Sequence, residues 1–455
     1  MNTTKVSKRP IFGNTFLCAL LPAVVVLAAF PCLNAVLRAA DTTDPRQWVT
    51  ENMPSLVELY RHLHQTPELS THEKETSARM AKELRDAGAE VTTNVGGYGV
   101  VGVLKNGSGK VLLLRSDMDA LPVVEETGLP YASKIRTKDA HGVTVGVMHA
   151  CGHDVHMTNL IGVARYLASH RDAWSGTIDF VFQPAEETGS GAEAMIQDGL
   201  FSRFPQPNFA VALHDSADVP TGKITYHPGY MLANVDSVDI VIKGRGGHGA
   251  SPEATIDPIV IAAKLVLDLQ TIVSRELKPT DPAVVTVGSI HAGTKHNIIS
   301  GECRLQLTLR SFSPQVRKHL QESVRRKAYA AAESAGAPKP TVEISEGTPS
   351  LFNDPELTQR IATILKHHLG DDAVEQAEAV MGGEDFSRYQ QPNVPICMYR
   401  LGAVNQKRLD AFAASHVPPT SLHSALFYPD IEETLAVGVP SMVYIATDLL
   451  KHESK

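Results

Sequence analysis

Several apolar runs in this sequence end directly in side chains that bind metal ions, and this repeated pattern constrains the fold most strongly. "VLLLRSDMDALP" leads into Asp119, "FVFQPAEE" into Glu186 and Glu187, and "VALHDS" into His214. Helix-like segments separate the runs, and alternating strands and helices favour an α/β sheet with helices on both faces. Such sheets bind ligands beyond the carboxyl ends of their strands. The pattern therefore predicts a metal site at that edge of the sheet.

The densest group of such side chains is "HACGHDVHMTN" at residues 149–159. Cys151 and His153 flank Gly152, which permits a tight turn that aims both side chains at one point. Thiolate and imidazole suit zinc, and imidazole also suits manganese, cobalt or nickel. His156 is interpreted as a capping or exposed histidine and is left out of the ligand set. Cys151 as a nucleophile is the alternative, but the surrounding metal-type groups favour a ligand.

The neighbouring carboxylates Glu186 and Glu187 repel each other unless a cation or a proton lies between them. One is expected to bind metal and the other to act as general base to an attacking water. An exposed acidic turn is the alternative for such a pair. Asp119 is expected to ligate a metal or to orient a ligand histidine, unless it only caps a turn. A lone histidine after a strand is more often structural, but the accumulation of these residues favours function for His214.

The order of the expected elements divides the chain into parts. Apolar residues at three- and four-residue spacing predict helices over residues 48–88 and 158–172. Between about 232 and 343 the order becomes strand, helix, strand, strand, helix, strand, which predicts a small ferredoxin-like α+β domain. The fold class is therefore an α/β catalytic domain with helices around a mixed sheet, interrupted by this α+β insertion. The predicted domains are a signal peptide at 1–40, the first part of the catalytic domain at 41–231, the insertion at 232–343, and the second part of the catalytic domain at 344–455.

The first forty residues combine a basic start, an apolar run and small residues near Ala39 and Ala40, as secretory signal peptides do. We expect export to the periplasm or the medium, and an uncleaved membrane anchor is the alternative. Four of the 42 Lys and Arg residues and none of the 50 Asp and Glu residues lie in this segment, so the remaining chain carries a formal charge of −12. That charge does not favour nucleic acid or an anionic membrane as a partner. Three cysteines outside the segment are too few for a disulfide scaffold.

Taken together, these motifs resemble the M20 metallopeptidase family, and most closely its amidohydrolase branch of hippurate hydrolases, indole-acetyl–amino-acid hydrolases and N-acyl-amino-acid deacylases. The resemblance runs from about residue 50 to 450 through "LRSDMDALPVVEETGLPYAS", "MHACGHDVHM", "FQPAEETGSGA", "IKGRGGHGASP", "HNIISGECRLQLTLRSF" and "MGGEDFS". It implies a hydrolase with two divalent metal ions per subunit (manganese, zinc, cobalt or nickel) and a homodimer formed through the inserted domain. The metal ligands that it implies are Cys151, His153, Glu187, His214 and His423.

The resemblance also implies roles for residues whose function their chemistry alone does not determine. Glu186 would be the general base, and Asp119 would hold a ligand histidine. His248, on the Gly-rich loop "GRGGHGASP", would reach the partner subunit's site and stabilise the oxyanion. Asn297 and Arg310 would hold substrate, and Gly383 would let the backbone approach it; sheet-edge polar residues are the alternative for the first two. The wider family often has an aspartate at the position of Cys151, so metal identity is not carried over.

The function expected from these residues is hydrolysis of the amide bond of N-acyl amino acids, of the hippurate or N-acetyl type, to a carboxylic acid and an amino acid. An exported carboxypeptidase or dipeptidase that acts on short peptides is the alternative within the same chemistry. A binding protein that has lost catalysis is the alternative from another class. The presence of both Glu186 and His248 favours an enzyme.

Overall fold

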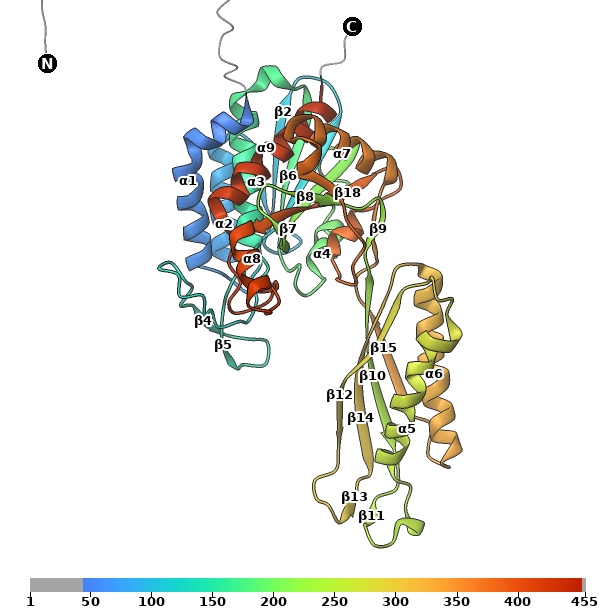
Figure 1. Ribbon diagram of the computed structural model, residues 1–455. Helices are drawn as coiled ribbons and strands as arrows, with labels where there is room; N and C mark the ends of the chain where they lie inside the picture. Colours follow the sequence, from blue (N-terminus) through green and yellow to red (C-terminus); the bar gives the residue numbers. More distant parts are fainter. Residues whose placement is uncertain (1–43, 452–455) are drawn as a thin grey trace, which may run out of the picture. The chain divides into compact units, whose positions relative to one another are not determined.

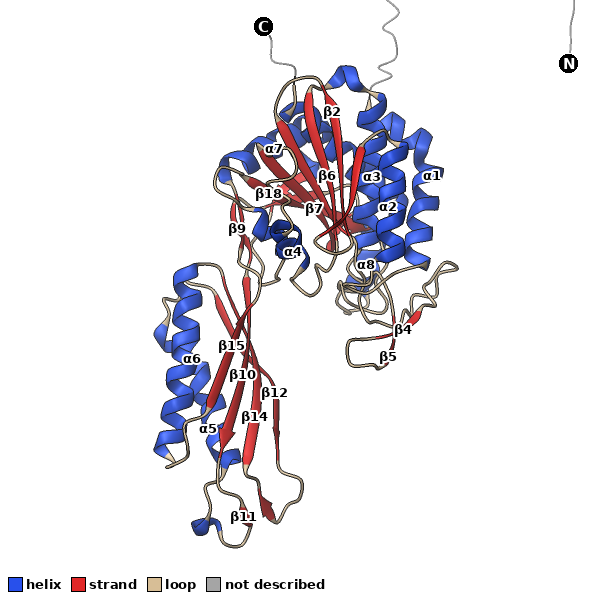
Figure 2. Cartoon of the chain, turned by 180° about the vertical axis from the view of Figure 1, so that it is seen from behind, coloured by secondary structure: helices blue, strands red, loops and turns tan. Residues whose placement is uncertain are grey.

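The computed structural model of this protein describes residues 44–451 (Figures 1 and 2). The predicted signal peptide falls on residues outside that range, so it stays a prediction. Within the described residues, no helix combines the length and the apolar character that crossing a membrane requires.

The larger part of the described chain is built on an eight-stranded mixed sheet with the order β1-β2-β6-β3-β7-β18-β8-β17. Four central neighbours, β6, β3, β7 and β18, run parallel, so their carboxyl ends meet at one edge. The strands are β1 (Glu90–Val95), β2 (Gly99–Asn106), β3 (Val111–Asp117), β6 (Gly176–Gln183), β7 (Phe209–Pro220), β8 (Ile224–Tyr226), β17 (Val374–Gln376) and β18 (Ile396–Val404). This arrangement confirms the expected mixed sheet.

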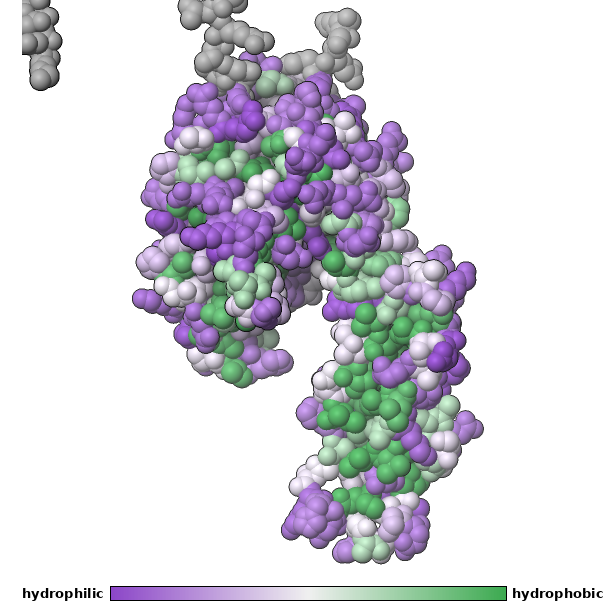
Figure 3. All heavy atoms as spheres, in the orientation of Figure 1, coloured by the Kyte–Doolittle hydropathy of each residue, from purple (hydrophilic) through white to green (hydrophobic). Residues whose placement is uncertain are grey.

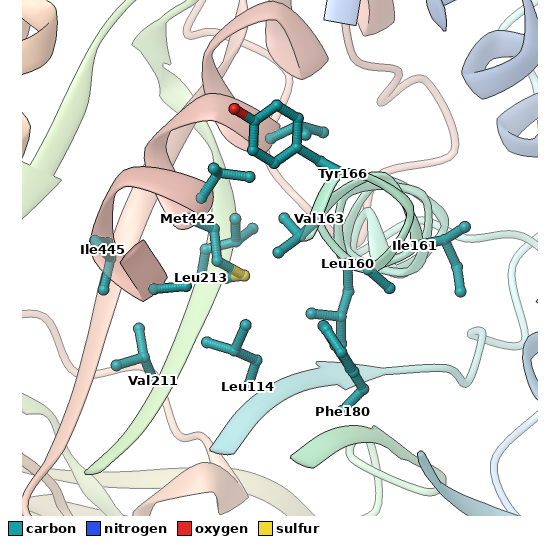
Figure 4. Packing of buried hydrophobic residues seen from close by; sticks show 14 of the residues in the cluster. Leu114, Leu160, Ile161, Val163, Tyr166, Phe180, Val211, Leu213, Met442 and Ile445 are labelled. Atoms are coloured by element: carbon teal, nitrogen blue, oxygen red, sulfur yellow. The ribbon is translucent and has the colours of Figure 1, made fainter. Parts of the chain in front are cut away.

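Helices cover the sheet, and most of the hydrophobic core lies on one of its faces. There α3 packs against Leu114, Phe180 and Val211 of the sheet and against Met442 of α9 (Figure 4). The opposite face is covered by α4 and by the segment around Phe386. The helices of this part are α1 (Pro45–Gln65), α2 (Lys74–Asp86), α3 (His153–Ser169), α4 (Gly191–Gln197), α7 (Pro355–Leu369), α8 (Gln406–Ala414) and α9 (Ile431–Leu449).

Helix α3 begins at His153, five residues before the start predicted from its apolar spacing. The predicted start lay too far along the chain because the first turn of the helix is polar. It contains His153, Asp154 and His156, although these side chains are buried. Gly152 precedes the helix with φ +73°, and a Cβ there would lie 2.3 Å from Asp215 Oδ2. A left-handed conformation and a close approach together require glycine at this position.

The second sheet is four-stranded and antiparallel, with the order β12-β14-β10-β15, and α5 and α6 pack on one face (Figure 1). Cys303, Leu305, Leu307 and Leu309 are buried toward these helices, as the alternation of "ECRLQLTLR" predicts. Together these elements form the four-stranded layer, residues 234–346, and the predicted domain boundaries at 232 and 343 stay predictions. Its elements are β10 (Asn234–Lys243), α5 (Pro258–Thr271), β12 (Ala283–Ala292), β14 (Glu302–Ser311), α6 (Pro314–Ser334) and β15 (Thr341–Glu346).

The described residues also form three short two-stranded sheets. β11 with β13 extends a loop of the four-stranded layer, β9 pairs with β16 next to that layer, and β4 pairs with β5 in the loop before α3. Their bounds are β4 (Arg136–Lys138), β5 (Thr144–Gly146), β9 (Gly229–Leu232), β11 (Gly247–His248), β13 (Ile298–Ile299) and β16 (Leu351–Asn353).

Candidate metal centre

The predicted metal-binding side chains meet at the carboxyl edge of the parallel strands. β3 delivers Asp119, β6 delivers Glu186 and Glu187, and β7 carries His214. The turn at Gly152 adds Cys151 and His153 from the start of α3. The five predicted ligands fall into overlapping groups whose donor atoms lie within 4.8 Å of one another: Cys151–His153–His214, Cys151–Glu187–His423 and, with Glu186, His153–Glu186–Glu187.

His153 is held so that one ring nitrogen is free for a cation. Its Nδ1 donates to the carbonyl oxygen of Asp119 at 2.8 Å and lies 3.3 Å from the Asp119 carboxylate. Its Nε2 is buried without a hydrogen-bond partner. Oxygens of Asp117, Glu187 and Glu186 lie 3.7, 3.8 and 4.0 Å from that Nε2. An unpartnered ring nitrogen that faces three carboxylates is the environment of a metal ligand.

Asp119 occupies the position expected of a residue that holds a ligand. Besides orienting His153, its Oδ2 accepts the backbone N–H of Glu187 at 2.9 Å and the hydroxyl of Ser70 at 2.6 Å. These contacts lower the pKa of Asp119 against the opposing effect of burial. The carboxylate therefore stays ionised while it fixes two of the predicted ligand residues at once.

The second group of donors surrounds the Cys151 sulfur. Its Sγ lies 3.2 Å from His423 Nε2 and 3.6 Å from His214 Nε2. His214 donates from Nδ1 to the carbonyl oxygen of Asp215 at 2.7 Å, which turns its Nε2 toward the sulfur. His423, which has φ +67°, donates its backbone N–H to Ala150 at 2.8 Å. Glu187 Oε2 lies 3.6 Å from His423 Nε2.

These donors fit a pair of divalent cations. Imidazole, thiolate and carboxylate together suit zinc and its first-row neighbours. The groups share Cys151 and Glu187, so two cation positions would lie side by side. Burial raises the pKa of the Cys151 thiol and of Glu186 well above their ordinary values, and neighbouring carboxylates add to the effect. A bound cation reverses that effect, because it stabilises the deprotonated forms.

The sequence reasoning missed a buried chain of hydrogen bonds beneath this centre. His156 Nδ1 lies 2.6 Å from Asp117 Oδ1, and its Nε2 lies 3.1 Å from Asp215 Oδ1. His156 is therefore buried and engaged at both nitrogens, and the interpretation as a capping or exposed histidine was wrong. The spacing of three residues from His153 would have placed both rings on one face of α3. Asp215 follows His214 directly, yet nothing in the sequence distinguishes it from a loop carboxylate.

Two further residues support the loops that present the carboxylates. Arg115 is fully buried and donates to Asp117 at 2.7 Å and to Glu384 at 2.9 Å, which ties "MGGEDF" to β3. Glu384 therefore plays a structural part. Glu73 accepts the backbone N–H of Ala185 at 2.8 Å. Since Ala185 has φ +52°, this contact stabilises the strained turn that precedes Glu186.

A cavity of about 970 Å³ opens over the donors. Its lining includes Glu186, His423, Arg310 and Gly383. His248 and Asn297 are not among the lining residues. They lie next to each other, since Gly249 donates to the carbonyl oxygen of Asn297 at 2.9 Å.

Strand β14 explains why this chain does not bring all predicted substrate residues together. Arg310 lies at its cavity end, whereas Glu302, at its other end, directly follows the loop that carries β13, the partner strand of β11. Eight steps along a strand span roughly 26 Å. A single chain therefore places Arg310 and Gly383 at the cavity and holds His248 and Asn297 at the far end of the four-stranded layer.

A mixed α/β sheet whose carboxyl edge gathers His, Cys and Glu donors under an open cavity defines a metal-dependent hydrolase. The sequence model of peptidase family M20/M25/M40 matches residues 113–426. The chain therefore belongs to this family, and it is an enzyme that hydrolyses amide bonds.

Relatives and a solved structure agree with that assignment. The chain is 36% identical to thermostable carboxypeptidase 1 of Saccharolobus solfataricus over 357 residues, 78% of this chain and 87% of that protein. It is 37% identical to the N-acetyl-L-cysteine deacetylase of Bacillus subtilis over 360 residues, 78% of this chain and 82% of that protein. A structure described as a dinuclear metal-binding peptidase of the M20 family from Bacillus subtilis is 31% identical, with a TM-score of 0.72 and coverage of 88% and 99% of the two chains.

A buried ion network beside the metal centre predicts a pH dependence of stability. His64 on α1 lies 2.7 Å from Asp154 Oδ2 at the start of α3 and 3.1 Å from Glu125 Oε1. Burial alone would lower the pKa of His64, but the two carboxylates outweigh it and raise the pKa from 6.5 to about 9. Because His64 binds its proton more tightly in the folded state than in the unfolded state, its protonated ring stabilises the fold. This contribution to the free energy of unfolding is complete below pH 6.5 and is lost as the pH rises through 9.

We expect His64→Gln to lower the free energy of unfolding by roughly 3 kcal/mol at pH 6 and much less above pH 9. Denaturant unfolding of metal-saturated protein across this range measures the difference. His141→Gln, which changes an exposed histidine between β4 and β5, is the matched control. A deficit that stays constant with pH would contradict the account.

Proposed function

We propose that this enzyme hydrolyses the amide bond of N-acyl amino acids, releasing a carboxylic acid and an amino acid. The observation that carries the proposal is the cavity that places Arg310 over the same carboxylates and histidines that form the candidate metal centre. A guanidinium can hold the carboxylate of an amino acid bidentately, so the adjacent amide is directed toward Glu186. The similarity to a protein named N-acetyl-L-cysteine deacetylase supports this substrate class.

The chain's own residues supply binding and proton transfer. Cys151, His153, Glu187, His214 and His423 would hold the divalent ions, which would supply Lewis-acid chemistry that lowers the pKa of water and polarises the acyl carbonyl. Glu186 takes the proton from the attacking water and returns it to the leaving amine. Burial and Glu384 raise its pKa above the ordinary value, and bound cations would oppose that rise.

Gly383 shapes the wall next to Arg310. A Cβ at this position would lie 2.4 Å from Val235 Cγ2 and 3.4 Å from Arg310 Nη1. Any side chain here would therefore clash with the Val235 side chain and would lie against the guanidinium of Arg310. We assign to Gly383 the role of keeping room for the substrate's carboxylate beside Arg310.

The experiment that tests the function is release of free amino acids from a panel of substrates. Residues 41–455 are purified, stripped of metal by chelation, and assayed with hippurate, N-acetyl amino acids and dipeptides. We expect no release without metal and release from acyl amino acids when manganese, zinc, cobalt or nickel is added back. Dipeptide cleavage alone would favour the carboxypeptidase alternative, which the similarity to a carboxypeptidase supports. No release from folded, metal-loaded protein would favour a binding protein.

Substitution of the general base separates catalysis from metal binding. Glu186→Gln keeps the size of the side chain but removes its proton-accepting oxygen, so we expect kcat to fall by about 10²- to 10⁴-fold. Metal content, measured by elemental analysis after gel filtration, should stay at the wild-type level. Glu193→Gln in α4, outside the cavity lining, is the matched control and should keep its activity. Near-normal turnover by Glu186→Gln would exclude Glu186 as the base.

We also propose that two copies pair through the four-stranded layer, so that the partner's His248 and Asn297 complete the cavity. β12 is an edge strand of its sheet, and an edge strand can pair with its own copy. On α5, Ile259, Val260 and Leu267 expose 42%, 53% and 73% of their surface. Figure 3 shows hydrophobic residues gathered on the visible face of this layer. Exposed apolar patches of this kind mark association surfaces.

The dimer is tested by placing a charge on its proposed interface. Leu267→Lys should convert a dimer into a monomer in sedimentation velocity and should lower kcat, because His248 and Asn297 would no longer reach a site. Val143→Lys changes an exposed residue next to β5 and should leave both the dimer and the activity unchanged. A wild-type monomer with full activity would contradict the proposal.

A further inference from the structure

The cavity contains a second arginine, Arg400, which has no role in the reaction proposed above. It lies in β18, where it pairs in register with His214 of the parallel strand β7. Neighbouring strands are separated by about 4.8 Å, so the two side chains stand next to each other on one face of the sheet. Met398, two residues earlier on the same face, also lines the cavity. Arg400 is thus part of the cavity wall beside a predicted metal ligand.

The guanidinium of Arg400 is partly buried in the cavity wall and has no counterion among the described residues. Among residues 44–451, no carboxylate oxygen lies within the 4.0 Å of an ion pair with it, and it makes no hydrogen bond. Asp218 attracts this charge, but the Asp218 carboxylate is exposed and accepts the Ser216 hydroxyl at 2.8 Å. Burial lowers the pKa of Arg400 from its ordinary value, against the attraction of Asp218. A partly buried guanidinium that lacks a counterion can bind an anion that enters the cavity.

In the proposed function, Arg310 already binds the one carboxylate that every N-acyl amino acid carries. It comes from β14 of the four-stranded layer, its Nε donates to Thr308 Oγ1 at 3.2 Å, and it lies against Gly383. Arg400 comes from the other sheet and has His214 on one side and Thr225 of β8 on the other. The cavity therefore presents two guanidinium groups from separate walls.

We propose that Arg400 binds a second carboxylate of the substrate, so that the enzyme prefers dicarboxylic N-acyl amino acids. This inference rests on the proposed amide hydrolysis and narrows its substrate class. The second carboxylate can belong to the side chain of an acidic amino acid or to the far end of a dicarboxylic acyl group. Both present the same planar anion to a guanidinium, with two parallel N–H···O bonds.

Two pairs of nearly isosteric compounds distinguish these sources. N-acetyl-L-glutamate is compared with N-acetyl-L-glutamine, and N-succinyl-L-alanine with N-succinamoyl-L-alanine. In each pair the second carboxylate is replaced by a neutral amide, while size and the scissile bond are kept. We expect wild-type holoenzyme to prefer the acid over its amide in at least one pair, and that pair identifies where the second carboxylate lies.

The variant Arg400→Gln tests whether the preference depends on this residue. A charged hydrogen-bonded pair contributes enough that its loss should lower the acid-to-amide ratio of kcat/KM by about 10-fold or more, mainly through KM. Arg400→Lys should restore part of the ratio, since it keeps the charge. Arg203→Gln, outside the cavity lining, should leave the ratio unchanged. A ratio near one in the wild type, or an equal loss on acid and amide in Arg400→Gln, would overturn the inference.

Failure of the proposed reaction is separated from failure of this inference by calorimetry. The same four compounds are titrated into metal-loaded Glu186→Gln protein, with and without Arg400→Gln. If the wild type hydrolyses none of them and none of the N-acyl amino acids of the first panel, the proposed function fails. Tighter binding of an acid than of its amide, abolished by Arg400→Gln, would still support the second carboxylate site. Equal binding of acids and amides would refute it.

Discussion

The structure depends on the accumulation of negative charge at the carboxyl edge of four parallel strands. Carboxylates that leave water need a compensating cation, since burial of an unpaired charge costs far more than a fold can supply. The chain provides two such cations itself: Arg115 pairs with Asp117 and Glu384, and His156 bridges Asp117 and Asp215. Oxygens of Asp119 and Glu187 remain buried without a hydrogen-bond partner, next to the free Nε2 of His153. The remaining charge is the reason for metal binding at this place.

Hydrogen bonds at the same edge fix the orientation of the donor side chains. His153 and His214 each donate from Nδ1 to a backbone carbonyl oxygen, and this selects the tautomer that leaves Nε2 as a ligand. Gly152 allows α3 to begin within contact distance of Asp215, and Glu73 fixes the strained turn at Ala185. Glu186 and Glu187 thus lie on short, supported turns at the end of a strand. Of the residues proposed to meet substrate, Arg310 and His248 come from the four-stranded layer, whereas Gly383 and Arg400 do not.

The mixed sheet, the antiparallel layer and the gathering of ligands were predictable because each depends on a local pattern. Apolar runs that end in Asp119, Glu186 or His214 place those residues at one edge as soon as the strands are parallel. The period-two alternation of "ECRLQLTLR" likewise determines which face of β14 is buried. The start of α3 and the burial of His156 were not predictable in this way, since they depend on contacts with Asp117 and Asp215, which belong to other strands. Arg400 shows the same limit: its register with His214 comes from the pairing of β18 with β7, segments separated by nearly two hundred residues.

The central claim is that this edge holds two adjacent divalent cations. Anomalous diffraction from crystals of the metal-loaded protein, measured at the absorption edge of the added metal, locates the ions directly. We expect two peaks per chain, both within the group formed by Cys151, His153, Glu187, His214 and His423. A single peak, or a peak within the Asp117–His156–Asp215 chain of hydrogen bonds, would contradict it, because that chain would then be the metal site and not its support.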